Sequence, residues 1–334
     1  MTQPVVARNW WARSRWMLPL IVVAPMLVLA RALGTHAIIF PEGAALAMGV
    51  WVLGLEGWTA SRWRVLALPP LCAAAGVVIV GAELPRVVAE ICGVTFGLLV
   101  LAACDSRLAP AVSAAVLPIV FGIDEWSYPI AVLVICTVIA AFWTLVHHPA
   151  ARHLDDQVPR RYPGSVAATG WLVIVAWILI AGWQLQLPAV VLAPPLFVSA
   201  LEWLGRGELV AGDGLRRWAL LTAAGLAGSI ATQLVPVSAI AGILAVCATL
   251  ALMWLLSTPH PPALAIALIP QILDASQPWH YAASIATGAA VLYIGVFSAE
   301  RLTRHASRDP RARCRQPHTP AHARPDVAPD PTAR

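Results

Sequence analysis

The chain has 334 residues, of which 59% are hydrophobic and 12% charged, and its formal net charge is +5. Soluble globular domains carry about 25% charged residues, so this composition excludes an ordinary soluble domain and indicates a protein that crosses the membrane several times. All 22 basic residues are Arg, which excludes a Walker-type phosphate loop and any enzyme that forms a Schiff base through Lys.

Apolar runs separated by short polar breaks predict two series of membrane segments. The first series occupies residues 17–34, 37–57, 65–82, 86–104, 108–122 and 128–146. The second occupies residues 167–184, 187–204, 217–235, 237–256, 261–273 and 280–299. A helix needs about 20 apolar residues to cross the hydrocarbon core. The fifth run of each series is shorter, so we expect one half-helix or re-entrant segment in each.

These runs divide the chain into four parts. Residues 1–146 form a first membrane repeat, and residues 167–300 form a second. Residues 147–166 are a polar linker between them. The tail, residues 301–334, is rich in Pro and Arg and lacks apolar periodicity, which predicts disorder. The predicted fold class is therefore an all-α polytopic membrane protein built from two repeats of about six segments each.

The two series align at a nearly constant shift. Pro110 matches Pro262 at a shift of 152 residues, and Trp126 matches Trp279 with one residue inserted. Each half has an even number of predicted crossings, so the two copies should point the same way. This pattern predicts parallel repeats related by an axis along the membrane normal.

The distribution of arginines predicts the orientation in the membrane. If the segments alternate from a cytoplasmic N-terminus, twelve of the arginines before the tail lie on the cytoplasmic side, and only Arg31 and Arg86 lie outside. An excess of basic residues marks the cytoplasmic side of membrane proteins. We therefore expect a bacterial inner-membrane protein with both termini and the linker in the cytoplasm.

The stretch STPHPPALAIALIPQIL, residues 257–273, contains a helix break between two apolar segments. Proline suits the first turn of a helix and stops a helix that arrives from the other side. Pro261 and Pro262 therefore predict a new helix that begins beside His260. Its free N–H groups would form an anion site if the break lies within the membrane. Pro110, preceded by Arg107, repeats this break; the alternative is that both breaks lie at the membrane surface.

Two acidic residues within the spans are further candidates, because charges inside the membrane are costly and often functional. These are Glu42 and Glu90. For Glu90 a salt bridge with Arg86 one turn earlier is an alternative. Three histidines of the linker, His147, His148 and His153, are better explained as a solvated loop than as a metal site.

Residues 190–300 resemble the HPP family of integral membrane proteins, which is named for its His-Pro-Pro motif. His260, Pro261 and Pro262 match the motif, although the Ala-Gly-Ala that usually follows is Ala-Leu-Ala here. The resemblance implies a helical membrane protein. Some plastid and cyanobacterial members are linked to nitrite transport, so it also implies a transporter.

We therefore predict a transporter or channel-like permease for a small solute, with an inorganic anion such as nitrite as the substrate class that the resemblance implies. Enzyme motifs are absent, and we expect no cofactor, no metal and no nucleic-acid partner; the partners are the lipid bilayer and the solute. The alternative is a membrane scaffold or sensor that transports nothing. The candidate site residues are His260, Pro261, Pro262, Pro110, Arg107, Glu42 and Glu90.

Overall fold

The computed structural model describes residues 15–59, 61–146, 162–185, 188, 192–205, 210–273 and 278–308. Throughout these residues the regular structure is helical, without strands. Five of the described helical segments are long and apolar enough to cross a membrane: Arg62–Gly81, Arg86–Ala103, Gly164–Gly182, Ser238–Leu255 and Trp279–Leu302. The prediction of an all-α polytopic membrane protein is confirmed.

Helices of the first half follow the predicted apolar runs. They are α2 (Leu20–Leu33), α3 (Glu42–Ala47) with the π-helical turn η1 (Met48–Leu53), α4 (Glu56–Thr59), α5 (Arg62–Gly81), α6 (Arg86–Ala103), α7 (Pro110–Phe121) and α8 (Ser127–Val146). The correspondence follows from composition, since apolar stretches bounded by polar or proline-containing breaks form helices in a membrane.

Helices of the second half also follow the predicted apolar runs. Its helices are α9 (Gly164–Ile178) with η3 (Leu179–Gln184), α10 (Pro194–Leu204), α11 (Ala211–Leu234), α12 (Ser238–Leu255), α13 (Pro262–Leu268) with the 3₁₀ turn η5 (Ile269–Gln271), and α14 (Pro278–Arg308). Helix α14 continues past the predicted boundary at residue 300 and ends at Arg308. Residues 147–161 of the linker, including its three histidines, and residues 309–334 of the tail lie outside the described residues.

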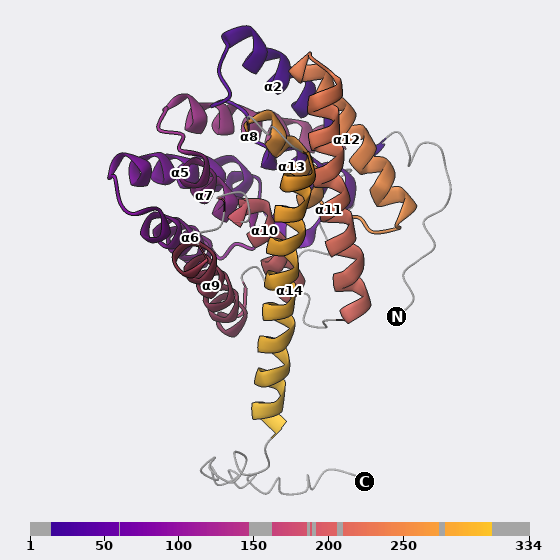
Figure 1. Ribbon diagram of the computed structural model, residues 1–334. Helices are drawn as coiled ribbons and strands as arrows, with labels where there is room; N and C mark the ends of the chain where they lie inside the picture. Colours follow the sequence, from indigo (N-terminus) through magenta and orange to yellow (C-terminus); the bar gives the residue numbers. More distant parts are fainter. Residues whose placement is uncertain are drawn as a thin grey trace, which may run out of the picture.

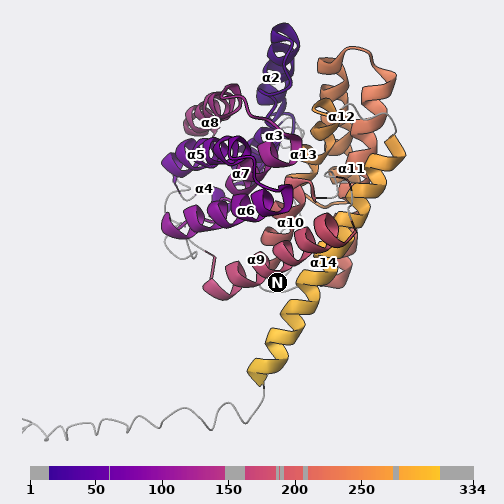
Figure 2. The ribbon, with the colours of Figure 1, turned by 60° about the vertical axis from the view of Figure 1, so that its left-hand side comes forward.

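Four short helices, α3, α7, α10 and α13, occupy the centre of the molecule (Figure 2). All residues of α3 and α13 are buried. Helix α7 has 12 residues, which gives a length of about 18 Å against the roughly 30 Å of a hydrocarbon core. The helix of the second predicted run in each half packs against the helix of the fifth run in the other half: α3 contacts α13, and α10 contacts α7. The centre is therefore shared by both halves.

Some contacts recur at the predicted shift of 152 to 153 residues. The Tyr128 hydroxyl donates to the carbonyl oxygen of Ala114 at 3.3 Å, and the Tyr281 hydroxyl donates to that of Ile266 at 2.7 Å. Helices at matching positions of the two halves nevertheless differ in direction. Helix α5 runs across the direction of α11, its counterpart, in both views (Figures 1 and 2). The internal duplication and its parallel orientation remain predictions.

Candidate functional site

His260 lies in the turn that joins α12 to α13. Helix α12 ends at Leu255, and Ser257 has a positive φ of 49°. The Thr258 hydroxyl then donates to the carbonyl oxygen of Leu256 at 3.0 Å. Pro262 is the first residue of α13, as expected for a ring that fixes a helical φ and has no N–H to satisfy. The predicted break at the His-Pro-Pro motif is thus present, and the His260 side chain at its start is fully buried.

The start of α13 offers no free backbone donor to an anion, which corrects one expectation. Pro261 and Pro262 have no N–H group. The next two N–H groups, of Ala263 and Leu264, donate to the carbonyl oxygens of His260 and Pro261 at 3.1 and 2.9 Å. Because the prolines remove two donors and the turn uses the next two, any anion selectivity has to come from side chains.

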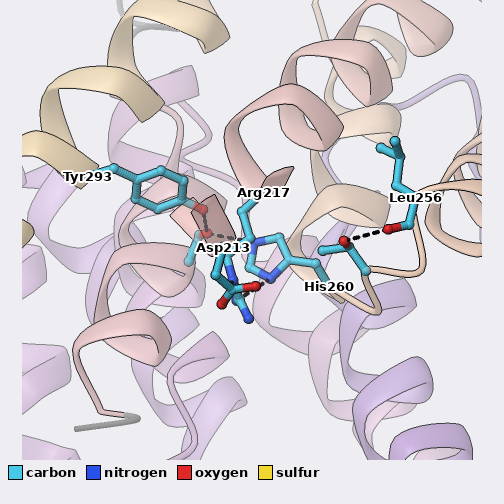
Figure 3. Close-up of polar contacts among 7 residues, drawn as sticks. Asp213, Arg217, Leu256, His260 and Tyr293 are labelled. Atoms are coloured by element: carbon cyan, nitrogen blue, oxygen red, sulfur yellow. Dashed lines mark hydrogen bonds and ion pairs between the residues drawn. The ribbon is translucent and has the colours of Figure 1, made fainter. Parts of the chain in front are cut away.

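Both ring nitrogens of His260 are engaged by side chains from other helices. The Nδ1 atom lies 3.1 Å from a terminal nitrogen of Arg217, and Nε2 lies 2.6 Å from the Ser199 hydroxyl (Figure 3). An arginine only donates hydrogen bonds, so Nδ1 has to accept. The ring is then neutral, with its proton on Nε2 facing Ser199. The expectation that His260 adds positive charge at low pH therefore conflicts with this geometry.

A line of polar side chains extends from His260 in both directions. On one side, Arg217 Nε donates to Asp213 Oδ2 at 3.1 Å; the Arg217 side chain is 2% exposed and that of Asp213 40%. On the other side, the Ser199 hydroxyl is hydrogen bonded to the Tyr293 hydroxyl. We call Asp213, Arg217, His260, Ser199 and Tyr293 the His260 cluster. It runs from the partly exposed carboxylate to a buried phenol.

A cavity of about 350 Å³ lies between α10, α11 and α14, beside the His260 cluster. Its walls are mainly aromatic and aliphatic, and Tyr293 belongs to both the cavity and the cluster. Gly214 on the cavity wall faces the ring of Trp203 so closely that a Cβ atom there would lie 2.9 Å from it. The space next to the cluster is therefore predominantly apolar.

Arg107 is not brought to His260. Its guanidinium donates to the carbonyl oxygen of Gly205 at 2.7 Å and lies over the ring of Tyr162, 5.1 Å from the centroid. Gly205 follows Ser199 by six residues, which is about 9 Å along a helix. Burial raises the pKa of Tyr162, so its hydroxyl stays protonated and donates to the Arg107 carbonyl at 3.4 Å. Arg107 therefore holds the end of α10, while Pro110 begins α7 as predicted.

The two acidic candidates have different surroundings. Glu42, 1% exposed, accepts a hydrogen bond from the Ser113 hydroxyl through Oε1, and its Oε2 has no partner among the described residues. Glu90 lies on α6, with Oε1 2.7 Å from Arg86 Nε. The salt-bridge alternative for Glu90 is confirmed, and neither acid contacts the His260 cluster.

The sequence does not single out four residues of the His260 cluster: Asp213, Arg217, Ser199 and Tyr293. The arginine distribution assigns Arg217 to the cytoplasmic surface, because it follows Arg216 at the start of a span. Asp213 one turn earlier is the available signal, since that spacing favours a salt bridge on one helix. Ser199 and Tyr293 lie 61 and 33 residues from His260 and give no local signal.

The comparisons with known proteins match one part of the chain. Residues 220–308 match the family model described as the HPP transmembrane region. Neither a curated protein nor a solved structure matches the chain. The matched segment includes most of α11 and all of α12, α13 and α14, and with them His260 and Tyr293, whereas Ser199, Asp213 and Arg217 precede it. This match, over the segment in which His260, Pro261 and Pro262 form the motif, supports membership of the HPP family of membrane proteins.

Proposed function

We propose that the protein transports a small inorganic anion such as nitrite across the membrane, and that the anion binds at Arg217 beside His260. The observation that carries this proposal is a buried guanidinium, 2% exposed, whose charge is balanced by a partly exposed carboxylate. An arginine stays charged at any physiological pH. A charge held inside a membrane protein is costly and commonly marks an ion pathway.

Asp213 acts as an internal substitute for the anion. Its side chain is 40% exposed and is attached to Arg217 through the Nε donor at 3.1 Å. An incoming anion replaces the carboxylate on the guanidinium, and the Asp213 side chain then rotates towards the solvent. Guanidinium forks bind two oxygens of one planar anion well. Nitrite fits this requirement, with the Ser199 and Tyr293 hydroxyls as neighbouring donors.

The neutral His260 ring positions Arg217 rather than adding charge. Its Nδ1 atom accepts from the guanidinium, and its Nε2–H group is directed at Ser199. The ring thereby links α11 to α10 through the turn before α13. Helices α10 and α13 belong to the four central helices. A displacement of the Arg217 side chain is therefore transmitted through His260 to the helices that both halves share.

The function is tested by flux measurements in vesicles that contain the purified protein. Vesicles with the wild-type protein should take up nitrite in a saturable manner, well above protein-free vesicles, which report leakage of the neutral acid. His260→Ala should lower the saturable flux about tenfold or more, since it removes the acceptor that orients Arg217; tenfold corresponds to about 1.4 kcal/mol. Uptake by the wild-type protein no faster than the leak would refute transport of this anion.

For the orientation, we propose both termini and the linker in the cytoplasm of a bacterial inner membrane. The arginine distribution supports it: apart from the buried Arg217, eleven arginines before the tail lie on that side against Arg31 and Arg86. Reporter fusions at Arg152 and after Arg308 should both give a cytoplasmic signal. A periplasmic signal at either position would contradict the proposal.

A further inference from the structure

Glu42 is a buried acid without a basic partner among the described residues. It begins α3, which packs against α2, α7, α8 and α13. Helices α7 and α13 carry no ionisable side chain, and the one basic residue of α2, Arg31, is exposed. The phenols of Tyr128 and Tyr281 interact with the carboxyl electrostatically, and α8 also carries the buried thiol of Cys136. None of these groups supplies a positive charge to Glu42.

An ionised carboxylate in such a place is costly, and binding a proton removes the charge. The two oxygens also differ. Oε1 accepts from Ser113, while Oε2 is buried and has no partner among the described residues. A hard metal cation would require more oxygen ligands than this acid and Ser113 offer. The adjacent carbonyl oxygen of Ala114 already accepts from Tyr128. The chemistry of this position therefore fits a proton.

We propose that Glu42 binds the proton that moves with the anion in each transport cycle. This inference rests on the proposed anion transport and adds its driving ion. Glu42 is on α3, which contacts α13 directly after the His260 turn, and its partner Ser113 is on α7, which contacts α10. Ser199 of the His260 cluster is on α10. The acid and the anion site are thus joined by the four central helices.

Charge balance favours transport of the two ions in the same direction. In the empty protein Glu42 is ionised and Asp213 neutralises Arg217. In the loaded protein a proton neutralises Glu42 and one monovalent anion is added, so the interior has the same net charge as before. An exchange of proton for anion would alternate between states that differ by two charges. Moving the more highly charged state through an apolar interior is the costlier process.

Infrared difference spectroscopy on the purified protein tests proton binding without any assay of transport. The wild-type protein should show the carbonyl stretch of a protonated, buried carboxylic acid that disappears as pH rises. Glu42→Gln should lack this band, and Glu90→Gln, which removes a buried acid paired with Arg86, should retain it. Ser113→Ala keeps the acid but removes its donor, so the midpoint of the transition should move to higher pH. A wild-type band that survives in Glu42→Gln overturns the assignment.

Vesicles loaded with a pH-sensitive dye test the coupling. Nitrite entry through the wild-type protein should acidify the interior beyond the protein-free leak. Glu42→Gln should lose most of this protein-dependent acidification and of the uphill nitrite uptake driven by a pH gradient, while Glu90→Gln keeps both. Saturable wild-type nitrite flux without acidification, or flux that requires sodium, would overturn the coupling and leave anion transport standing. If no saturable flux occurs, the proposed function fails, and the infrared result alone decides whether Glu42 binds a proton.

Discussion

Arg217→Gln should strongly lower saturable anion flux, whereas Asp213→Asn should increase the affinity for the anion. Gln keeps much of the side-chain length but removes the charge, and hydrogen bonds to charged groups contribute about 1.5–3 kcal/mol. The flux at low anion concentration should therefore fall at least tenfold. Asn retains a hydrogen bond to Arg217 Nε but no longer competes as an anion. The half-saturating nitrite concentration should fall several-fold, measured as initial uptake rates in vesicles.

Arg107→Ala is the matched control for this experiment. Arg107 is also an arginine near α10, but its guanidinium donates to the Gly205 carbonyl instead of facing His260. Its removal should lower the unfolding temperature and leave the half-saturating concentration unchanged in the protein that remains folded. Loss of anion affinity in Arg107→Ala together with normal affinity in Arg217→Gln would contradict this assignment. The anion site would then lie at the helix break before Pro110.

The helices were predictable because their signals are local. Apolar runs specify membrane segments, and Pro110 and Pro262 each begin a helix where a ring without an N–H group is tolerated. The salt bridge of Glu90 with Arg86 has the same origin, since residues four apart share a helix face. Features set by one or two helical turns could therefore be identified without knowledge of the tertiary structure.

The candidate site was less predictable because its contacts join distant segments. Ser199 lies 61 residues from His260 and 94 residues from Tyr293, yet it is hydrogen bonded to both. The expected anion site at the helix start was wrong for a different reason. The prolines that signal the start also remove its donors, and the turn itself uses the next N–H groups. In the proposed site the positive charge comes from Arg217, which the sequence assigns to the membrane surface.

The last prediction concerns two glycines on which the packing of the central helices depends. Gly76 on α5 and Gly228 on α11 are 152 residues apart, and a Cβ atom at each would overlap a backbone carbonyl oxygen, that of Ala115 on α7 and of Ala267 on α13 respectively. Backbone atoms cannot rotate away as a side chain can, so the helices would have to separate. Overpacking of this kind costs about 1–3 kcal/mol or more. Gly76→Ala and Gly228→Ala should each lower the unfolding temperature, measured in detergent.

Each helix contains its own control. A Cβ atom added at Gly81 on α5 or at Gly212 on α11 would meet no described atom within 4 Å, so alanine fits at both positions. Alanine is favoured over glycine within a helix by about 1 kcal/mol, and Gly81→Ala and Gly212→Ala should leave stability equal or slightly higher. The contrast within one helix separates helix propensity from the tight crossing. If all four variants unfolded at the wild-type temperature, α5 and α11 would not pack against α7 and α13 as closely as the structure has them. The close packing of the central helices that connects Glu42 to the His260 cluster would then be contradicted.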